Sequence, residues 1–172
     1  MIFGDAHNFA IEAFHEPSGP EWHGFGRLCL HIQGIQIGDI HDKHCSLFNI
    51  TRRFRELIDN IHLLWDSEFA GLSDTEIFAI VDRELYIGDP TENRSQYTAF
   101  DFLTNDGEML NGVKTFILCR PQGEVHILFQ FRDLEIHSRS CSVGSFRQVA
   151  KAYVEWFDQQ LITPVPQYFP VD

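Results

Sequence analysis

The sequence predicts an α+β fold: a mostly antiparallel sheet of about six to seven strands with about three helices packed on it. Two observations predict this class. Runs rich in β-branched and aromatic residues, separated by Gly and Pro, occupy both halves of the chain, whereas three other stretches repeat their apolar residues every three or four positions. The resulting order is strands, two helices, strands and one helix. It lacks the strand–helix alternation that a parallel doubly wound sheet requires.

The strongest strand signal lies in residues 113–132. Two apolar arms flank a turn in which Pro121 presets one backbone dihedral and Gly123 accepts a positive φ. In the second arm every other residue from Val125 to Phe131 is apolar, and the first arm is apolar on both faces, as in a strand covered on two sides. We predict a β-hairpin here, in the middle of the sheet. Further strands are predicted at residues 9–14, 27–32, 35–37, 97–103 and 134–141, with Gly34 in a second hairpin turn.

Three amphipathic stretches predict helices. Their apolar stripes are Phe54, Leu57, Ile58, Ile61, Leu64 and Trp65 in the first, Ile77, Phe78, Ile80, Val81 and Leu85 in the second, and Phe146, Val149, Ala150, Tyr153, Val154 and Phe157 in the third. Asn49 or Thr51 is expected to cap the first helix. Capping boxes, in which a serine and an acid or amide three residues later bond each other's backbone, open the second at Ser73 and the third at Ser145. Gly88 is well placed to end the second helix.

Length and composition limit the classes of function. The 172 residues suffice for one domain, which we place at residues 1–172. The formal net charge of −12 argues against a nucleic-acid partner, because phosphate binding needs clustered Lys and Arg. No apolar run approaches the length of a membrane span, and no secretion signal is visible. The four cysteines show no metal-binding pair spacing. A cytoplasmic protein without a membrane partner is predicted.

The sharpest candidate for chemistry is the run His41-Asp42-Lys43-His44-Cys45. Imidazole, carboxylate and thiolate all ligate metals, and a catalytic zinc uses three protein ligands. A metal-dependent, hydrolase-like enzyme using His41 and His44 is therefore one alternative. The other interpretation is a solvated loop, because the chain has no HExxH pattern and no second Cys/His pair. Nucleophile elbows and phosphate-binding loops are also absent from the sequence. We predict no catalytic residues, no metal and no cofactor.

Acidic side chains are concentrated between residues 59 and 92. This stretch holds nine acids and one base, a local charge of −8. One interpretation is that acids such as Asp74 favour a helix amino terminus and the others keep the surface soluble. The functional interpretation is a docking face for a basic protein, with aromatic anchors near Trp65 and Phe69. The predicted partner-binding residues are Asp59, Trp65, Asp66, Glu68, Phe69, Asp74, Asp82, Asp89 and Glu92.

Patterns at both ends of the chain are similar to those of a known family. They are Met1-Ile-Phe-Gly-Asp5, Phe9-Ala-Ile-Glu12, Trp22 and the following strand into Ile32-Gln-Gly34, and the closing segment from Val143 to Trp156. The chain thereby resembles immunity protein family 42, small bacterial proteins encoded beside polymorphic toxins. The resemblance implies a protein that binds the cognate toxin domain and neutralises it in the cytoplasm without catalysis, and it carries over no site residues. A non-enzymatic regulatory binding module is the remaining alternative.

Overall fold

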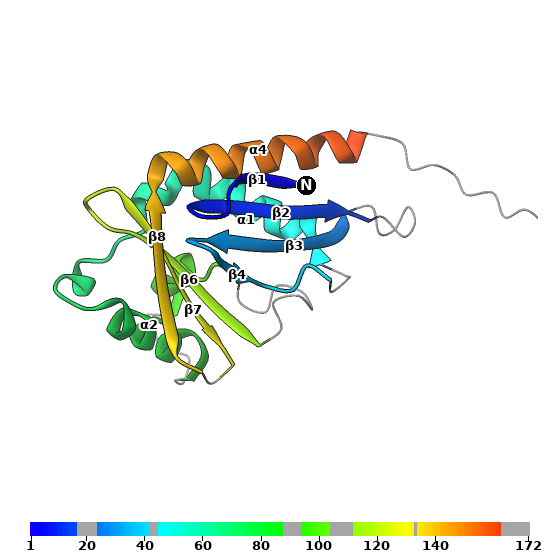
Figure 1. Cartoon of the computed structure of the whole chain (residues 1–172). Helices are drawn as coiled ribbons and strands as arrows, with labels where there is room; N and C mark the ends of the chain where they lie inside the picture. The colour runs from blue at the N-terminus through cyan, green and yellow to red at the C-terminus, as the bar shows by residue number, and fades with distance from the viewer. Residues whose placement is uncertain (17–23, 42–44, 88–93, 104–111, 133, 163–172) are drawn as a thin grey trace, which may run out of the picture.

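The computed structural model describes residues 1–16, 24–41, 45–87, 94–103, 112–132 and 134–162 (Figure 1). The strands are β1 (Ile2–Asp5), β2 (Phe9–His15), β3 (Phe25–Ile32), β4 (Ile35–Ile37), β5 (Cys45–Ser46), β6 (Val113–Cys119), β7 (Glu124–Phe131) and β8 (Ile136–Ser142). The helices are α1 (Leu47–Asn60), α2 (Asp74–Asp82), α3 (Arg94–Tyr97) and α4 (Val143–Ile162). Short 3₁₀ turns are η2 (Ile61–Leu63), η3 (Ser67–Phe69) and η5 (Thr98–Phe100), and η4 (Arg83–Ile87) is a π-helical turn.

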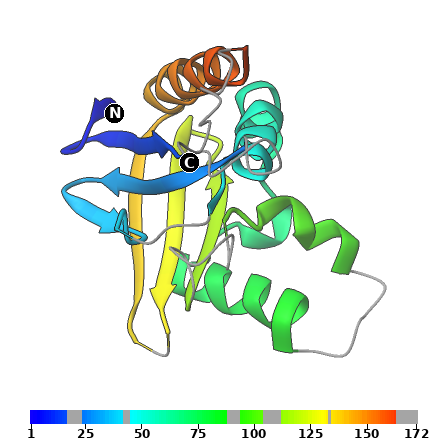
Figure 2. The same cartoon turned by 90° about the vertical axis from the view of Figure 1, so that its right-hand side faces the viewer.

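Within the described residues, the strands form two antiparallel sheets. The larger has the order β1-β2-β3-β4, with β5 also paired to β3, and the smaller has the order β6-β7-β8. The strands of the two sheets run across one another in both views (Figures 1 and 2). The α+β class is confirmed. The hairpin of residues 113–132 is also confirmed, but it belongs to the smaller sheet, where β7 is central and β6 is an edge.

Helices cover each sheet separately. The apolar face of β2 and β3, which includes Ile11 and Leu30, packs against α1 and α4, and these two helices also contact each other. Helix α2 packs on β7 and β8 at the end of the smaller sheet far from α4 (Figure 2). The chain passes directly from β8 into α4, so the last helix also joins the two sheets. The predicted core stripe of α4, from Phe146 to Phe157, is buried as expected.

The amino-terminal hairpins follow the sequence pattern with one addition. The strand at residues 9–14 is confirmed as β2, and the turn between β3 and β4 places Gln33 and Gly34 at φ values of 48° and 79°, as a two-residue hairpin turn requires. Strand β1 precedes them and was not predicted, because four residues carry little periodic signal. A side chain at Gly4, where φ is +98°, would place Cβ 2.4 Å from the carbonyl oxygen of Phe9, so β1 needs glycine there.

The predicted strand at residues 97–103 is wrong. The chain forms the end of α3 and the turn η5, and only Asp101 makes an isolated antiparallel bridge, to Phe116. The alternating apolar residues of this stretch belong to a tight turn and not to a β-strand. Phe100 and Phe102 are both buried in the core from this turn. The sequence Asn105-Asp106-Gly107, whose Asp-Gly pair predicts a turn, lies outside the described residues.

The prediction that Asn49 or Thr51 caps α1 is also wrong. Ser46 is the N-cap, and its Oγ accepts a hydrogen bond of 3.4 Å from the Asn49 N–H. Thr51 lies inside the helix, fully buried, where its hydroxyl donates to the Tyr153 hydroxyl of α4 at 2.9 Å. The sequence offered several residues able to cap a helix, and the pairing of β5 with β3 selects the earliest of them.

Of the other two predicted helices, α2 begins where the sequence predicts and α4 begins earlier. At α2 the Ser73–Glu76 capping box forms as predicted, with Ser73 N–H to Glu76 Oε2 at 2.8 Å and Glu76 N–H to Ser73 Oγ at 3.3 Å. Helix α4 begins at Val143, before the predicted box at Ser145, because Ser142 Oγ accepts from the Ser145 N–H at 3.1 Å. Gly88, the predicted end of the second helix, lies outside the described residues.

Phe54 of α1 lies where the layers meet. Its ring lies 5.4 Å from that of Tyr153 and 6.1 Å from that of Phe146, both on α4, and 5.7 Å from that of Phe102. Phe146 stacks on Phe9 of β2 at 5.3 Å. The backbone N–H of Phe102 donates to Thr115 of β6 at 3.0 Å. One side chain on α1 therefore links the larger sheet, its helices and the smaller sheet.

Replacing Phe54 with Ala is expected to lower the free energy of unfolding by about 3–5 kcal/mol, because it opens a large cavity among aromatic rings. The matched control is Phe48→Ala on the same helix. Phe48 is 53% exposed, so this change is expected to cost only about 0.5 kcal/mol. Urea denaturation of the two variants and the parent measures both values. Equal losses in the two variants would contradict the assigned role of Phe54.

Candidate partner-binding surface

The acidic stretch of the sequence becomes a surface where α1 turns toward α2. Helix α1 ends at Asn60, and a 3₁₀ turn follows at once. Asp66 then caps η3, its Oδ1 accepting from the Glu68 N–H at 2.9 Å. These local bonds hold the chain in tight turns that leave Asp59 and Glu68 exposed. Between the acids Leu63 is 65% exposed. We call Asp59, Leu63, Trp65, Asp66 and Glu68 the acidic surface.

The two aromatic residues near this surface have different environments. The Phe69 ring is fully buried, 5.1 Å from that of Phe100, so Phe69 presents no surface to a partner. Trp65 is half-buried, with its ring 5.9 Å from Phe69 and the Arg120 guanidinium 5.6 Å above it. A cation over an indole face is attracted by the ring quadrupole. Trp65 is therefore the aromatic residue of the predicted set that keeps an accessible part.

Neutral donors hold two acids of the surface in place. Gln96 Nε2 donates to Asp66 Oδ2 at 2.9 Å, and the Tyr97 hydroxyl donates to Glu68 Oε2 at 3.1 Å. Burial and the adjacent Glu68 carboxylate raise the pKa of Tyr97 to about 12, so the phenol keeps its proton at physiological pH. These bonds attach α3 to the acidic surface. They orient Asp66 and Glu68 without neutralising their charge.

Asp74, in contrast, serves inside the fold. Its carboxylate accepts hydrogen bonds from Arg120, from His126 Nδ1 at 2.9 Å and from the Ser138 hydroxyl. Burial raises the pKa of Asp74, but the bonds from His126, Ser138 and Arg120 together outweigh it and hold that pKa well below its ordinary value. The carboxylate thereby fixes the amino end of α2 to β7 and β8. It is not placed to meet a partner.

Other acids of the stretch also have cationic neighbours. Asp82 is only 8% exposed and pairs with Lys114 of β6 at 2.6 Å. Glu84 pairs with Arg83 at 3.0 Å. Asp89 and Glu92 lie outside the described residues. The charge of −8 counted along the sequence therefore overstates the charge that this side of the molecule offers to a partner.

The Asp74 cluster contains the residue types of a serine hydrolase but not their arrangement. A hydrolytic serine donates to the histidine that removes its proton. Here the Ser138 hydroxyl and the His126 ring both bond to Asp74. His126 Nε2 is buried without a hydrogen-bond partner among the described residues, 3.6 Å from Glu124 Oε2. The arrangement supports a structural role for this cluster.

The structure does not assemble the predicted histidine and cysteine run into one site among the residues it describes. His41 is exposed, and its backbone N–H donates to Asp39 Oδ1 at 2.9 Å. Cys45 is buried in β5, and residues 42–44, including His44, lie outside the described residues. Within the described part, the potential metal ligands that do lie together are Glu12, Cys29 and His31.

A shallow groove beside α1 carries the basic residues Arg52 and Arg53. Its volume is about 350 Å³, and its other lining residues include Asn49 and Asp101. Arg53 Nη2 donates to the Asp101 carbonyl at 2.8 Å and to that of Ala99. This arginine therefore holds the turn η5 in place. Among the described residues that line the groove, Arg52 is exposed and Arg53 is partly buried.

Comparison with solved structures identifies the fold. CdiI from Burkholderia dolosa AUO158 matches 91% of this chain and 99% of its own, with a TM-score of 0.58 and 16% sequence identity. At that identity the likeness shows a shared fold alone. A search of curated proteins gives no significant match. Within the described residues, no helix combines the length and the apolar character that crossing a membrane requires.

The sequence itself matches the model of a family of immunity proteins, so the molecule is an immunity protein, which neutralises a toxin. Its residues 1–156 match the model of the family Immunity protein 42, and the chain belongs to that family. The resemblance noted at both ends of the sequence is thereby confirmed, and it extends through the middle of the chain.

Sequence reasoning named acids of this stretch but not Leu63, Gln96 or Tyr97, which the structure places with them. Leu63 does not break the apolar spacing of the sequence, so its exposure could not be foreseen. It is exposed because α1 ends at Asn60. Gln96 and Tyr97 reach the acids from about 30 residues away. No local signal marks such pairs. The neutralising partner Arg120 is likewise distant in sequence from Asp74.

Replacing Asp74 with Asn is expected to lower the free energy of unfolding at pH 7 by about 1.5–3 kcal/mol, the range for hydrogen bonds to a charged group. Because the pKa of Asp74 is lower in the folded than in the unfolded chain, its stabilisation is fully present above about pH 4 and decreases as the pH falls below it. Chemical denaturation between pH 7 and pH 3 should show the variant and the parent converging. The control is Asp59→Asn, and a gap that does not depend on pH would contradict the assignment.

Proposed function

We propose that this immunity protein neutralises its toxin by binding alone, without catalysing a reaction, and that the acidic surface makes the contact. The observation that carries the assignment is Leu63, 65% exposed in a segment that also holds the exposed acids Asp59 and Glu68. An apolar centre within a polar rim is the arrangement found in protein interfaces. Trp65, half-buried at the edge of the same segment, adds an aromatic residue of the kind that contributes most to binding.

The proposed partner carries a basic face. The chain has a formal net charge of −12, and a field of this sign accelerates encounter with a cation-rich surface. Asp66 and Glu68 are held by the neutral donors Gln96 and Tyr97, so their charge is available to a partner. Asp74 and the other internally paired acids contribute less. The acidic surface is thus the part of the stretch where geometry and charge agree.

The proposed place of action is the cytoplasm, as the sequence also predicts. The four cysteines, Cys29, Cys45, Cys119 and Cys141, are buried as free thiols. Unpaired cysteines are the usual state in the reducing cytosol, whereas secreted proteins of this size tend to form disulfides. The thiols therefore support a cytoplasmic immunity protein.

Charge changes on the acidic surface test the electrostatic part of the proposal. The variant combines Asp59→Lys, Glu68→Lys and Asp66→Asn, since asparagine still caps η3. We expect the association rate with the toxin domain encoded beside this protein to fall about tenfold at low salt, and its dependence on salt to flatten. Stopped-flow fluorescence or surface plasmon resonance measures both quantities. Helical content by circular dichroism confirms that the variant folds.

The control for these charges is Glu155→Lys, and the two effects are compared per unit of charge changed, because the triple variant adds five charges and the control adds two. Glu155 is exposed on α4, about 12 Å along the helix from Arg147, the α4 residue that contacts His62. Its effect on the association rate is expected to be small at physiological ionic strength, because charges further apart than about 10 Å are screened. If both variants slow association equally per unit of charge changed, net charge alone acts and the acidic surface is not the contact.

The apolar centre has its own test. Leu63→Ala is expected to raise the dissociation rate of the toxin complex about tenfold, with little change in the association rate. Leu134→Ala is the matched control, because Leu134 is a leucine with an almost equal exposure of 66%. Both variants should unfold at the denaturant concentration of the parent. Unchanged dissociation in the Leu63 variant would place the interface elsewhere.

A further inference from the structure

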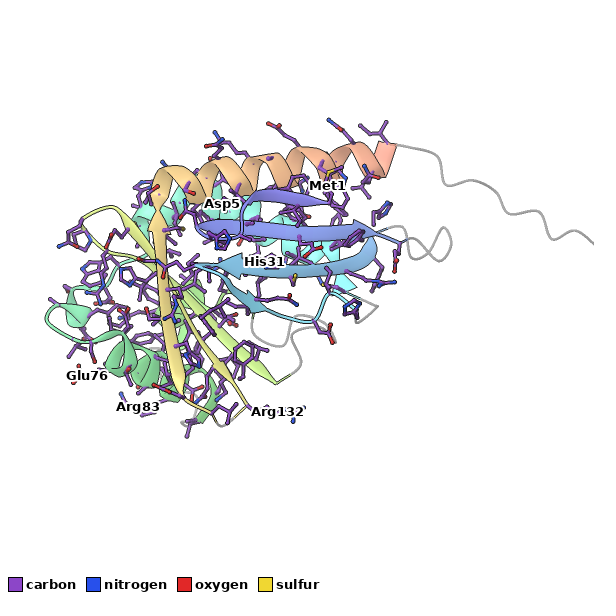
Figure 3. All side chains as sticks on the ribbon, viewed as in Figure 1. Met1, Asp5, His31, Glu76, Arg83 and Arg132 are labelled. Carbon is purple, nitrogen blue, oxygen red and sulfur yellow. The ribbon has the colours of Figure 1, made fainter. Side chains whose placement is uncertain are left out.

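Three side chains able to ligate a metal converge on the outer face of the larger sheet. Glu12 of β2 lies directly opposite Cys29 of β3 in the antiparallel register, and His31 follows two residues along β3. Residues two apart on a strand share one face. The other face of β3, which carries Leu28 and Leu30, packs into the core. Figure 3 shows His31 on β3.

The distances between the three ligand atoms fit one small ion. Cys29 Sγ lies 3.4 Å from His31 Nε2 and 3.7 Å from Glu12 Oε2, and His31 Nε2 lies 2.9 Å from Glu12 Oε2. Ligand atoms held about 2.0–2.3 Å from a tetrahedral zinc ion lie about 3.3–3.5 Å apart. Each observed edge is within about 0.4 Å of that range. The triangle is therefore already close to the base of a tetrahedral site.

We propose that Glu12, Cys29 and His31 form a three-ligand binding site for a divalent transition metal ion of the zinc type. Thiolate, imidazole and carboxylate together suit zinc, whereas magnesium and calcium prefer oxygen ligands alone. Cys29 is fully buried, but the side chains of Glu12 and His31 keep 19% and 16% of their surface exposed. An ion reaches the triangle from that side, and a water molecule fills the fourth position.

Charge balance favours the ion over the hydrogen bonds it replaces. Without metal, the Cys29 thiol donates to Glu12 over 3.7 Å, a long contact even for sulfur, and His31 bonds the same carboxylate oxygen. On binding, the thiol releases its proton and Sγ forms a bond to the metal. The two positive charges then offset the thiolate and the Glu12 carboxylate, which lie in adjacent strands.

Binding to this site is expected to stabilise the larger sheet. The ligands come from β2 and β3, whose pairing exists only in the folded chain, so the ion binds the folded state selectively. Zinc should raise the melting temperature by several degrees at micromolar concentrations. The site lies on a different element of the fold from the acidic surface, so its test does not depend on toxin binding.

The experiment uses the full chain, produced without a histidine tag and treated with a chelator. Isothermal titration with zinc chloride is expected to show one ion per chain with a dissociation constant at or below the micromolar range. Cobalt(II) added in place of zinc should give the absorption band of a cobalt–thiolate bond. Melting curves with and without zinc measure the stabilisation.

Matched variants separate this site from other thiols and histidines. Cys29→Ser and His31→Gln should weaken zinc binding at least tenfold, and Cys29→Ser should remove the cobalt–thiolate band. Cys141→Ser, a second buried thiol, and His41→Ala, in the run that resembles a metal site by sequence, should leave both unchanged. If Cys29→Ser does not fold, the partly exposed His31→Gln and Glu12→Gln decide the question. Zinc binding that is absent from the parent, or unaffected in these variants, overturns the proposal.

Discussion

The packing of Phe54 is the interaction on which the arrangement of the two sheets depends. Its ring contacts Tyr153 and Phe146 of α4 and Phe102 beside the smaller sheet. Aromatic rings bury large areas and prefer edge-to-face contacts, so a junction of four rings defines both distance and angle between layers. The buried hydrogen bond from Thr51 to Tyr153 adds a polar contact one turn away on α1. Each sheet is covered by its own helices, and this junction holds the two covered sheets together.

The acidic residues of this stretch form two groups, one bonded to cationic side chains and one bonded to neutral hydrogen-bond donors. Asp74 and Asp82 bond to cations and fix α2 to the smaller sheet. Asp66 and Glu68 bond to an amide and a phenol, so they keep their charge while their positions are fixed. A fixed charge near an exposed apolar residue favours binding, because less freedom is lost when the partner arrives. The same composition therefore serves stability in one part of the stretch and, under the proposed function, recognition in the other.

Sequence patterns predicted the elements that depend on local signals. The stripe of α4, the capping box at Ser73 and the hairpins around Gly34 and Gly123 are all present. Each is determined within a few residues by side-chain spacing or backbone dihedral preference. The stretch from residue 97 to residue 103 failed, because its alternating rings satisfy a buried 3₁₀ turn as well as a strand.

The sequence by itself determined the α+β class, the strands and helices with strong local signals, and membership of an immunity protein family, because periodicity and family patterns are written along the chain. Only the tertiary structure decided which strands share a sheet, which acids remain available and which metal ligands meet. Glu12 and His31 lie 19 residues apart, and the sequence pointed instead to the adjacent residues around His41. Strand pairing brings such residues together through contacts between distant segments, and those contacts leave no local pattern.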